Sequence, residues 1–244
     1  MLEGYSSVLT GGTSAIGQVI LSELVGYHSK VIFTYYQNEQ LAKELEEKYM
    51  GQAIGIKLNL LNGEEIDRAF TWMETKFGKI DYLINNAGIG TCIATEEITL
   101  NQWNETVALN LTAPFLCAQN AIKIFKKYGG GRIINIASVA GLTGGSFGAH
   151  YGATKAGLIG LTKSLARDYG KFGIVANVIA PGPIETEMTA SLSQSVIEGI
   201  LHATPLGRLG RAIEVAELVS QLLNPKMNYM NGQTLVIDGG RYMI

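Results

Sequence analysis

Cysteine, histidine and proline are scarce in this sequence, with two, three and five of them in 244 residues. Cys92 and Cys117 are too few for a disulfide framework and form no CxxC pair, which is typical of reducing compartments and favours a cytoplasmic location. The histidines are scattered and belong to no HExxH pattern, so the sequence predicts no metal site.

An excess of charge of one sign is also lacking. The chain has 19 Lys and Arg against 21 Asp and Glu, with no long block of like charges. This balance predicts neither a nucleic-acid nor an anionic-membrane partner. No apolar run reaches the ~18 residues of a membrane span, and residues 1–8 lack the basic segment of a secretory signal. We therefore expect a small-molecule partner.

The sequence does have a large apolar share, 47% against 16% charged residues, which is enough for a substantial core. Short apolar runs alternate with helical patterns along the chain. The runs that predict strands cover 6–10, 30–35, 53–58, 80–85, 132–137, 175–180 and 234–237. The patterns that predict helices cover 14–24, 39–49, 63–77, 103–127, 150–170 and 212–223.

This alternation predicts a parallel sheet. Apolar runs such as 31–33 and 133–134 are continuous, which is typical of strands that are buried on both faces. We therefore expect an α/β protein with a single-domain Rossmann fold over residues 1–244. Its core would be a doubly wound, seven-stranded parallel sheet with helices on both faces.

The alternation lapses at 183–207, where apolar residues recur at roughly helical spacing in a polar stretch. The segment follows the carboxyl end of a predicted strand, where ligands of such sheets bind, so we expect a substrate lid with an apolar underside. The alternative is an ordinary helix packed on the core. The recurring residues are Met188, Leu192, Val196, Ile197 and Ile200.

A glycine-rich turn at 10–17 joins the first predicted strand to the first helix. Small residues there let backbone N–H groups approach a pyrophosphate at the positive end of the helix dipole. Its place between a strand and a helix favours a dinucleotide site over a simple tight turn. The cofactor-binding candidates in the turn are Gly11, Thr13, Ser14, Ile16 and Gly17.

The end of the second predicted strand bears on which dinucleotide binds. An Asp or Glu there would hold the adenosine ribose and repel a 2′-phosphate. The residues present are Thr34, Tyr35, Tyr36, Gln37 and Asn38, with neither a carboxylate nor an arginine. NADP(H) is therefore favoured as the cofactor, with NAD(H) as the alternative, and Tyr35 and Tyr36 are candidate contacts.

Tyr151 and Lys155 are four residues apart and therefore share one face of a predicted helix. A nearby cation favours the ionised phenol, so the pair could exchange a proton with a substrate oxygen. Such a pair also arises by chance, but Ser138 and the run 85–88 each follow a predicted strand. Because carboxyl ends of parallel strands meet at one edge of a sheet, these residues predict one catalytic site.

These features together resemble the short-chain dehydrogenase/reductase family, and the resemblance covers essentially the whole chain. It rests on several motifs at fixed positions. They are the TGxxxxxG turn at 10–17, the NNAG run at 85–88, Asn110, Ser138, the YxxxK pair Tyr151 and Lys155, and Pro181-Gly182 followed by Ile184 and Thr186.

The resemblance implies a role for each catalytic candidate. Tyr151 would be the general acid in reduction and the base in oxidation, and Ser138 would hold the substrate oxygen. Lys155 would lower the pKa of Tyr151 and bind the nicotinamide ribose. Asn110 would hold a water molecule in a proton relay.

The resemblance also implies cofactor contacts. Asn59 and Leu60 would flank the adenine, although Asn59 replaces the more usual Asp. Ala15 stands where the family usually has a glycine, and Ser14 stands where many NADP-dependent members have Arg or Lys. The other implied contacts are Asn86, Ala87, Gly88, Pro181, Gly182, Ile184 and Thr186.

Within this family, the runs 131–138, 155–167 and 232–240 resemble 3-oxoacyl-[acyl-carrier-protein] reductases. That resemblance implies a 3-oxoacyl thioester substrate, an acyl carrier protein as a partner and a homotetramer. Gly129 and Phe172 replace commonly basic residues, which leaves Lys126, Lys127 and Lys171 nearby. A dehydrogenase of a sugar alcohol, steroid or other secondary alcohol is the alternative. A non-catalytic NAD(P)-sensing protein is the alternative of another class.

Overall fold

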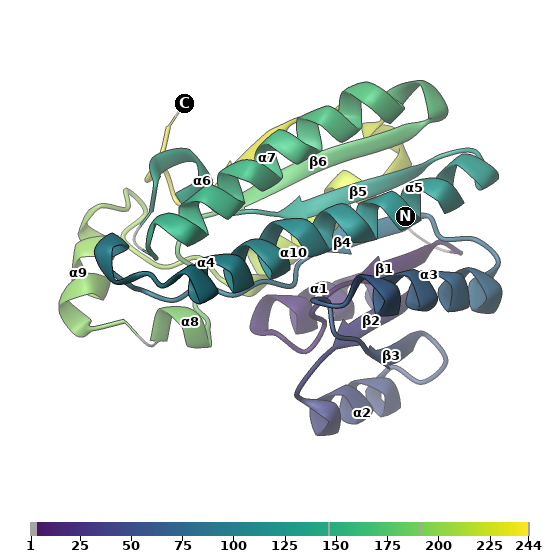
Figure 1. Cartoon of the computed structure of the whole chain (residues 1–244), viewed down its shortest axis with the longest axis horizontal. Helices are drawn as coiled ribbons and strands as arrows, with labels where there is room; N and C mark the ends of the chain where they lie inside the picture. The colour runs from purple at the N-terminus through teal and green to yellow at the C-terminus, as the bar shows by residue number, and fades with distance from the viewer. Residues whose placement is uncertain (1–3, 146, 191, 244) are drawn as a thin grey trace.

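A parallel sheet of seven strands forms the centre of the computed structural model, which describes residues 4–145, 147–190 and 192–243 (Figure 1). The strand order β3-β2-β1-β4-β5-β6-β7 confirms the doubly wound topology expected from the sequence. The strands are β1 (Ser6–Leu9), β2 (Lys30–Tyr35), β3 (Ala53–Lys57), β4 (Tyr82–Asn85), β5 (Gly131–Ile136), β6 (Ile174–Pro181) and β7 (Thr234–Ile237).

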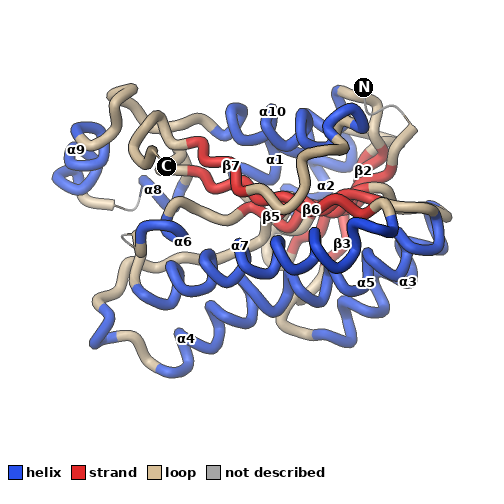
Figure 2. Tube along the Cα trace, turned by 90° about the horizontal axis from the view of Figure 1, so that it is seen from above, coloured by secondary structure: helices blue, strands red, loops and turns tan. Residues whose placement is uncertain are grey.

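Helices cover both faces of the sheet (Figure 2). Helices α1, α2 and α10 pack on one face, and α3, α5 and α7 pack on the other. The helices are α1 (Ala15–Gly26), α2 (Glu39–Lys48), α3 (Gly63–Phe77), α4 (Leu100–Val107), α5 (Ala113–Tyr128), α6 (Ala140–Thr143), α7 (Ala149–Tyr169), α8 (Glu187–Ala190), α9 (Gln194–His202) and α10 (Ala212–Leu223). Within the described ranges, no helix has the length and apolarity that a membrane crossing requires.

Strand β2 shows why these sequences form central strands. Val31 and Phe33 enter the core beneath α1, α2 and α10, whereas Ile32 enters the core beneath α3 and α5. Successive side chains of a strand point to opposite faces, so a continuous apolar run fills both cores.

The predicted helix over 103–127 is wrong in one respect, because a π-helical turn at 108–112 separates α4 from α5. Pro114 has no N–H to donate to the carbonyl of Asn110, four residues earlier, so the regular α-helical bond is missing there. Asn110 lies inside this turn and its side chain is fully buried.

A chain of buried side-chain hydrogen bonds ties two central strands to α7. The Asn85 amide of β4 donates to Asn135 Oδ1 of β5 at 2.8 Å, and the Asn135 amide donates to Thr162 Oγ1 of α7 at 2.7 Å. Buried polar groups need such partners, since an unpaired one costs ~1–3 kcal/mol. These bonds fix the elements that carry Ser138 and Tyr151.

Candidate active site

The segments that follow β1, β4, β5, β6 and β7 surround a cavity of about 470 Å³ at the carboxyl edge of the sheet. Helices α8 and α9 lie beyond this edge (Figure 1). Eleven of the residues predicted for the site line this one cavity: Ser14, Ile16, Asn86, Gly88, Ser138, Tyr151, Lys155, Pro181, Gly182, Ile184 and Thr186.

The glycine-rich turn has the tight geometry that a phosphate-binding turn needs. Gly11 adopts φ +66°, and a Cβ on Gly17 would lie 2.1 Å from the carbonyl oxygen of Gly11. Ser14 caps α1 by accepting a hydrogen bond from the Gly17 N–H at 3.1 Å. The turn therefore presents the positive end of the α1 dipole toward the cavity.

Asn86, after β4, is bonded to this turn. Its side-chain amide donates to the carbonyl oxygens of Thr10 and Gly11 at 3.1 and 3.0 Å, and to Ser14 Oγ at 3.1 Å. The Thr10 hydroxyl accepts hydrogen bonds from the N–H groups of Asn86 and Ala87, both at 3.0 Å. These bonds set the spacing between the two segments that close one side of the cavity.

Ser138 and Tyr151 form the centre of the site. Tyr151 lies on the first turn of α7 and is 8% exposed, and Ser138 follows β5. Burial raises the pKa of the Tyr151 phenol, and a hydrogen bond with the Ser138 side chain lowers it in part. The phenol is therefore protonated at neutral pH in the ligand-free protein.

Lys155 lies one helical turn beyond Tyr151. Its Nζ is 5.5 Å from the centroid of the Tyr151 ring and donates to the carbonyl oxygen of Ile136 at 3.0 Å. Burial lowers the pKa of Lys155 to about 8, because a dry environment disfavours the charged form. Because it lies beside the Tyr151 ring, the ammonium could donate hydrogen bonds to a ligand bound over that ring.

The side chain of Asn110 is hydrogen-bonded to the loop that follows β4. Its amide donates to the carbonyl oxygen of Ile89 at 2.8 Å and to Thr154 Oγ1 at 3.3 Å. Its Oδ1 accepts from the Ile89 N–H at 2.9 Å. The π-helical turn thus holds the loop after β4 against α7.

Comparisons with known proteins agree with this geometry. The family model described as enoyl-(acyl carrier protein) reductase matches residues 11–241. A solved Serratia marcescens short-chain dehydrogenase/reductase, a double mutant, superposes with a TM-score of 0.91, at 31% identity and with 98% of each chain covered. This chain belongs to the short-chain dehydrogenase/reductase family.

Curated relatives match this reductase over almost its whole length. The 3-oxoacyl-[acyl-carrier-protein] reductase FabG of Aquifex aeolicus is 39% identical, over 99% of this chain and 98% of its own. The FabG protein of Escherichia coli (strain K12) is 38% identical, over 99% of each chain. Membership of this family makes the protein an oxidoreductase that works with a nicotinamide cofactor.

The cavity of this reductase fits such a cofactor. The turn at α1 and the ammonium of Lys155 open onto the same cavity, so one dinucleotide could contact both. The ammonium has three protons, and the structure shows one of them donated, to Ile136. Gly88 keeps the backbone close, since a Cβ there would lie 3.0 Å from Asn110 Oδ1 and 3.5 Å from Lys155 Nζ.

The other predicted cofactor residues lie outside this cavity. Tyr35 and the 56%-exposed Tyr36 lie at the end of β2, and Asn59 follows β3. Asn59 Oδ1 accepts from the Leu61 N–H at 3.0 Å, and Leu60 is buried in the core. Strand β2 neighbours β1, so this area adjoins the turn. Gly11, Thr13, Gly17 and Ala87 shape the turn without lining the cavity.

Several lining residues were missed from the sequence, among them Val139, Thr143, Thr189, Arg241 and Tyr242. Arg241 and Tyr242 follow β7, and the rule that ligands gather at carboxyl strand ends applies to that strand too. The others lie in loops and short helices, where no periodic pattern marks the side that faces the ligand.

The segment 183–207 contributes to the cavity through Leu192 and Ile200, as an apolar underside would. Val196, which is 41% exposed, and Ile197 are not among the residues that line the cavity, and the side chain of Met188 lies outside the described part of the structure. That this segment opens and closes as a lid stays a prediction.

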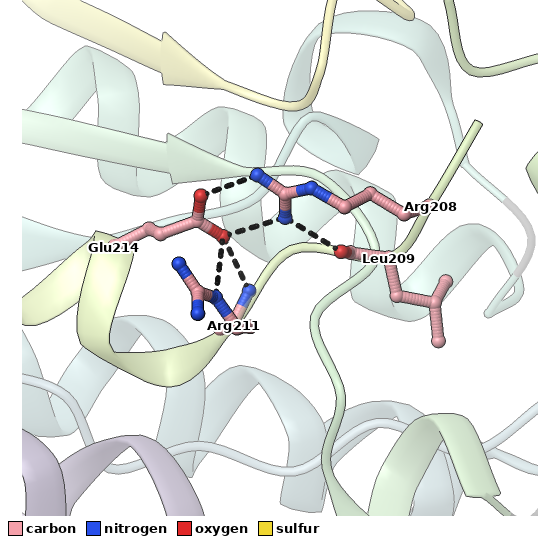
Figure 3. A network of polar contacts seen from close by, with 4 residues as sticks. All are labelled: Arg208, Leu209, Arg211 and Glu214. Atoms are coloured by element: carbon pink, nitrogen blue, oxygen red, sulfur yellow. Dashed lines mark hydrogen bonds and ion pairs between the residues drawn. The ribbon is translucent and has the colours of Figure 1, made fainter. Parts of the chain in front are cut away.

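The two ends of this segment are fastened together. Gly210 donates to the carbonyl oxygen of Pro183 at 3.0 Å and accepts from the Glu185 N–H at 2.8 Å. Arg208 donates to both oxygens of Glu214, at 2.9 and 2.6 Å (Figure 3). The Arg211 N–H donates to the same carboxylate at 2.7 Å. These contacts lower the pKa of Glu214 to about 2 and join the segment to α10.

Proposed function

We propose that this reductase uses NADPH to reduce a 3-oxoacyl thioester, carried by an acyl carrier protein, to the 3-hydroxyacyl thioester. The observation that carries the proposal is that Ser138, Tyr151 and Lys155 line one cavity with the glycine-rich turn. The FabG relatives are named as 3-oxoacyl-[acyl-carrier-protein] reductases, which supports the choice of substrate.

The reaction needs a hydride at the carbonyl carbon and a proton at its oxygen. NADPH, when bound, would supply the hydride and be oxidised to NADP⁺. Ser138 holds the carbonyl oxygen by donating a hydrogen bond. Tyr151 releases its phenolic proton to that oxygen as the C=O π bond breaks and the new O–H bond forms. The phenol begins protonated, and the hydrogen bond with Ser138, which lowers its pKa, moves it toward the range in which a general acid works best.

Lys155 and Asn110 would support this proton transfer. The Lys155 ammonium would bind the ribose hydroxyls and favour the phenolate that forms after transfer. The side chain of Asn110 is committed to Ile89 and Thr154, and Pro114 cannot donate to its main-chain carbonyl. That carbonyl is therefore the group through which Asn110 would hold a relay water.

The end of β2 supports NADPH over NADH. Glu39, the first carboxylate after β2, is engaged with Lys43 at 2.9 Å and with Lys57 at 3.4 Å. Lys57 lies beside Tyr35 in the strand register. A 2′-phosphate at this edge would therefore meet two ammonium groups and no unpaired acid.

Docking of a carrier protein would depend on a different basic surface, because Gly129 and Phe172 stand at commonly basic positions. The ammonium groups of Lys126 and Lys171 lie 4.5 and 5.2 Å from the ring centroid of Phe172. Lys127 is paired with Glu74 at 2.7 Å. Point charges of this kind could steer an acidic carrier without bidentate contacts.

Absorbance at 340 nm tests the proposal. The purified protein is given NADPH or NADH with acetoacetyl-acyl carrier protein, and separately with a panel of ketones, sugars and steroids. We expect oxidation of NADPH that depends on the thioester and is at least ~10-fold faster than with NADH. Oxidation of NADPH with other carbonyl compounds but not with the thioester would reject the thioester as the substrate. Binding of NADPH without any turnover would favour a sensing protein.

A further inference from the structure

The cavity holds a cation that the proposed chemistry does not use. Its charged lining residues, within the described ranges, are Lys155, Glu187 and Arg241. Lys155 is buried, bonded to Ile136 and assigned to the cofactor and Tyr151. Arg241 is the remaining cation, on a segment that no step of the reduction requires.

The backbone that carries Arg241 is firmly fixed. The carboxylate of Asp238 accepts hydrogen bonds from the N–H groups of Gly240 at 2.9 Å and Tyr242 at 2.6 Å, on either side of Arg241. Gly239 adopts φ +69°, and a Cβ there would lie 2.8 Å from Thr204 Cγ2. This turn directs the chain after β7 back over the cavity, and it thereby places Arg241 in the cavity lining.

The guanidinium of Arg241 has no hydrogen bond or ion pair with the residues that the structure describes, although the residue is only partly exposed. A guanidinium offers five N–H donors in a fork that matches a carboxylate or a phosphate. Taking such a group partly out of water is unfavourable unless an anion meets it. A ligand with a negative group would supply that partner.

The position of β7 excludes the pyrophosphate of the cofactor as this anion. Strand β7 is four strands from β1, where the phosphate-binding turn begins. At ~4.8 Å per strand the separation is about 19 Å. Ser138 follows β5, only two strands or about 10 Å from β7. The anion therefore belongs to the substrate and not to the cofactor.

We propose that Arg241 binds an anionic group of the substrate and that this reductase favours carbonyl substrates with a carboxylate or phosphate over their neutral counterparts. The inference rests on the proposed function and refines its substrate class. Two sources share this chemistry: the phosphate of a phosphopantetheine arm, and a second carboxylate on the acyl chain.

Two pairs of substrates distinguish these sources. One pair is acetoacetyl-pantetheine with and without its 4′-phosphate. The other is the N-acetylcysteamine thioester of acetoacetate and that of 3-oxoglutarate, which carries an extra carboxylate. We expect the wild-type protein to show at least ~10-fold higher kcat/KM for the anionic member of one pair, in line with hydrogen bonds to charged groups. The pair that shows the preference identifies the source.

The variant Arg241→Gln should remove that preference by raising KM at least ~10-fold more for the anionic substrate than for the neutral one. Arg241→Lys should retain part of the preference, and Arg68→Gln, on the exposed face of α3, serves as the control for a lost surface charge. Equal effects of Arg241→Gln on both members of each pair would overturn the inference.

Calorimetry separates this inference from the proposed function. The same pairs are titrated into the complex with NADPH in the Tyr151→Phe protein, where turnover is removed. Tighter binding of an anionic member, lost in the double variant with Arg241→Gln, supports the role of Arg241 even if the wild type reduces no thioester. No difference between the members of either pair would refute it.

Discussion

Burial moves the pKa values of Tyr151 and Lys155 in opposite directions, and both shifts favour the neutral form. The pKa of the phenol is raised, and that of the ammonium is lowered to about 8. The phenol is therefore held as an acid, while the lysine can respond to what binds above it. A cofactor ribose and a developing phenolate would each favour the charged lysine.

Replacing Tyr151 by Phe removes the proposed proton donor with little change of shape. We expect kcat to fall by ~10²–10⁴-fold, the usual contribution of a general acid, with the Kd for NADPH, measured by its fluorescence, within about twofold of the wild type. Tyr169→Phe, at the far end of the same helix, is the matched control and should be fully active. A Tyr151→Phe protein with wild-type kcat would exclude the phenol as the acid.

The lowered pKa of Lys155 makes the stability of the ligand-free protein depend on pH. The ordinary value is 10.5 and the folded value is about 8. Between these values the unfolded chain binds the additional proton, so the free energy of unfolding rises with pH. A shift of 2.5 units corresponds to about 3 kcal/mol across this range.

Urea unfolding of the wild type and Lys155→Met measures this effect. The variant should be the more stable protein at pH 7.5, because it buries no charge, and its advantage should shrink steadily as the pH rises toward 10.5. Lys163→Met removes an exposed lysine of the same helix and should show no such trend. A constant difference between wild type and Lys155→Met would contradict the burial of a charged Lys155.

At the scale of elements, the contact between Arg208 and Glu214 controls how firmly 183–207 is held. Glu214→Ala removes the acceptor of both Arg208 and the Arg211 N–H, so hydrogen exchange of the α9 amides should accelerate at least ~5-fold. The free energy of unfolding should fall by only about 1 kcal/mol, because the pair is largely solvated.

Glu217→Ala, one turn along α10 and exposed, is the matched control for this experiment. Its α9 amides should exchange as in the wild type. Acid should reproduce the effect of Glu214→Ala, because the stabilisation is present above pH ~4.5 and is lost as the pH falls toward the folded pKa of about 2. Unchanged exchange in Glu214→Ala would show that Gly210 alone fastens the segment.

The sequence predicts helices and strands well where an apolar pattern extends over many residues. The prediction fails where a single residue changes the backbone conformation. The bounds of β2, α3, α10 and β7 follow from periodicity and from flanking residues such as Gly78. The π-helical turn depends on Pro114, a residue that is also common at the first turn of a helix. Asp238 and the two glycines after it mark a turn, but this local pattern does not predict that Arg241 faces the cavity.

At the scale of the whole molecule, exposed apolar side chains on α4 and α5 support the homotetramer that the family resemblance implies. Leu100 is 71% exposed, Trp103 39% and Phe115 42%. We expect sedimentation at micromolar concentration to give the mass of four chains. The double variant Trp103→Glu with Phe115→Glu should shift the mass to dimers or single chains, because charges in an apolar interface are costly.

Trp72→Glu tests whether a charge in place of any exposed tryptophan would lower the mass of the assembly. Trp72 is 44% exposed on α3 and should tolerate the charge without a change of mass. A wild-type protein that sediments as one chain would reject the tetramer.

The buried bonds from Asn85 through Asn135 to Thr162 also bear on how such an enzyme acquires new substrates. They join β4, β5 and α7 and use no residue of 183–207. Mutations can therefore rebuild that segment, or exchange it for another, while the distance between the serine hydroxyl and the phenol is inherited unchanged. A lineage with this arrangement can diversify its substrates without having to evolve its proton donor a second time.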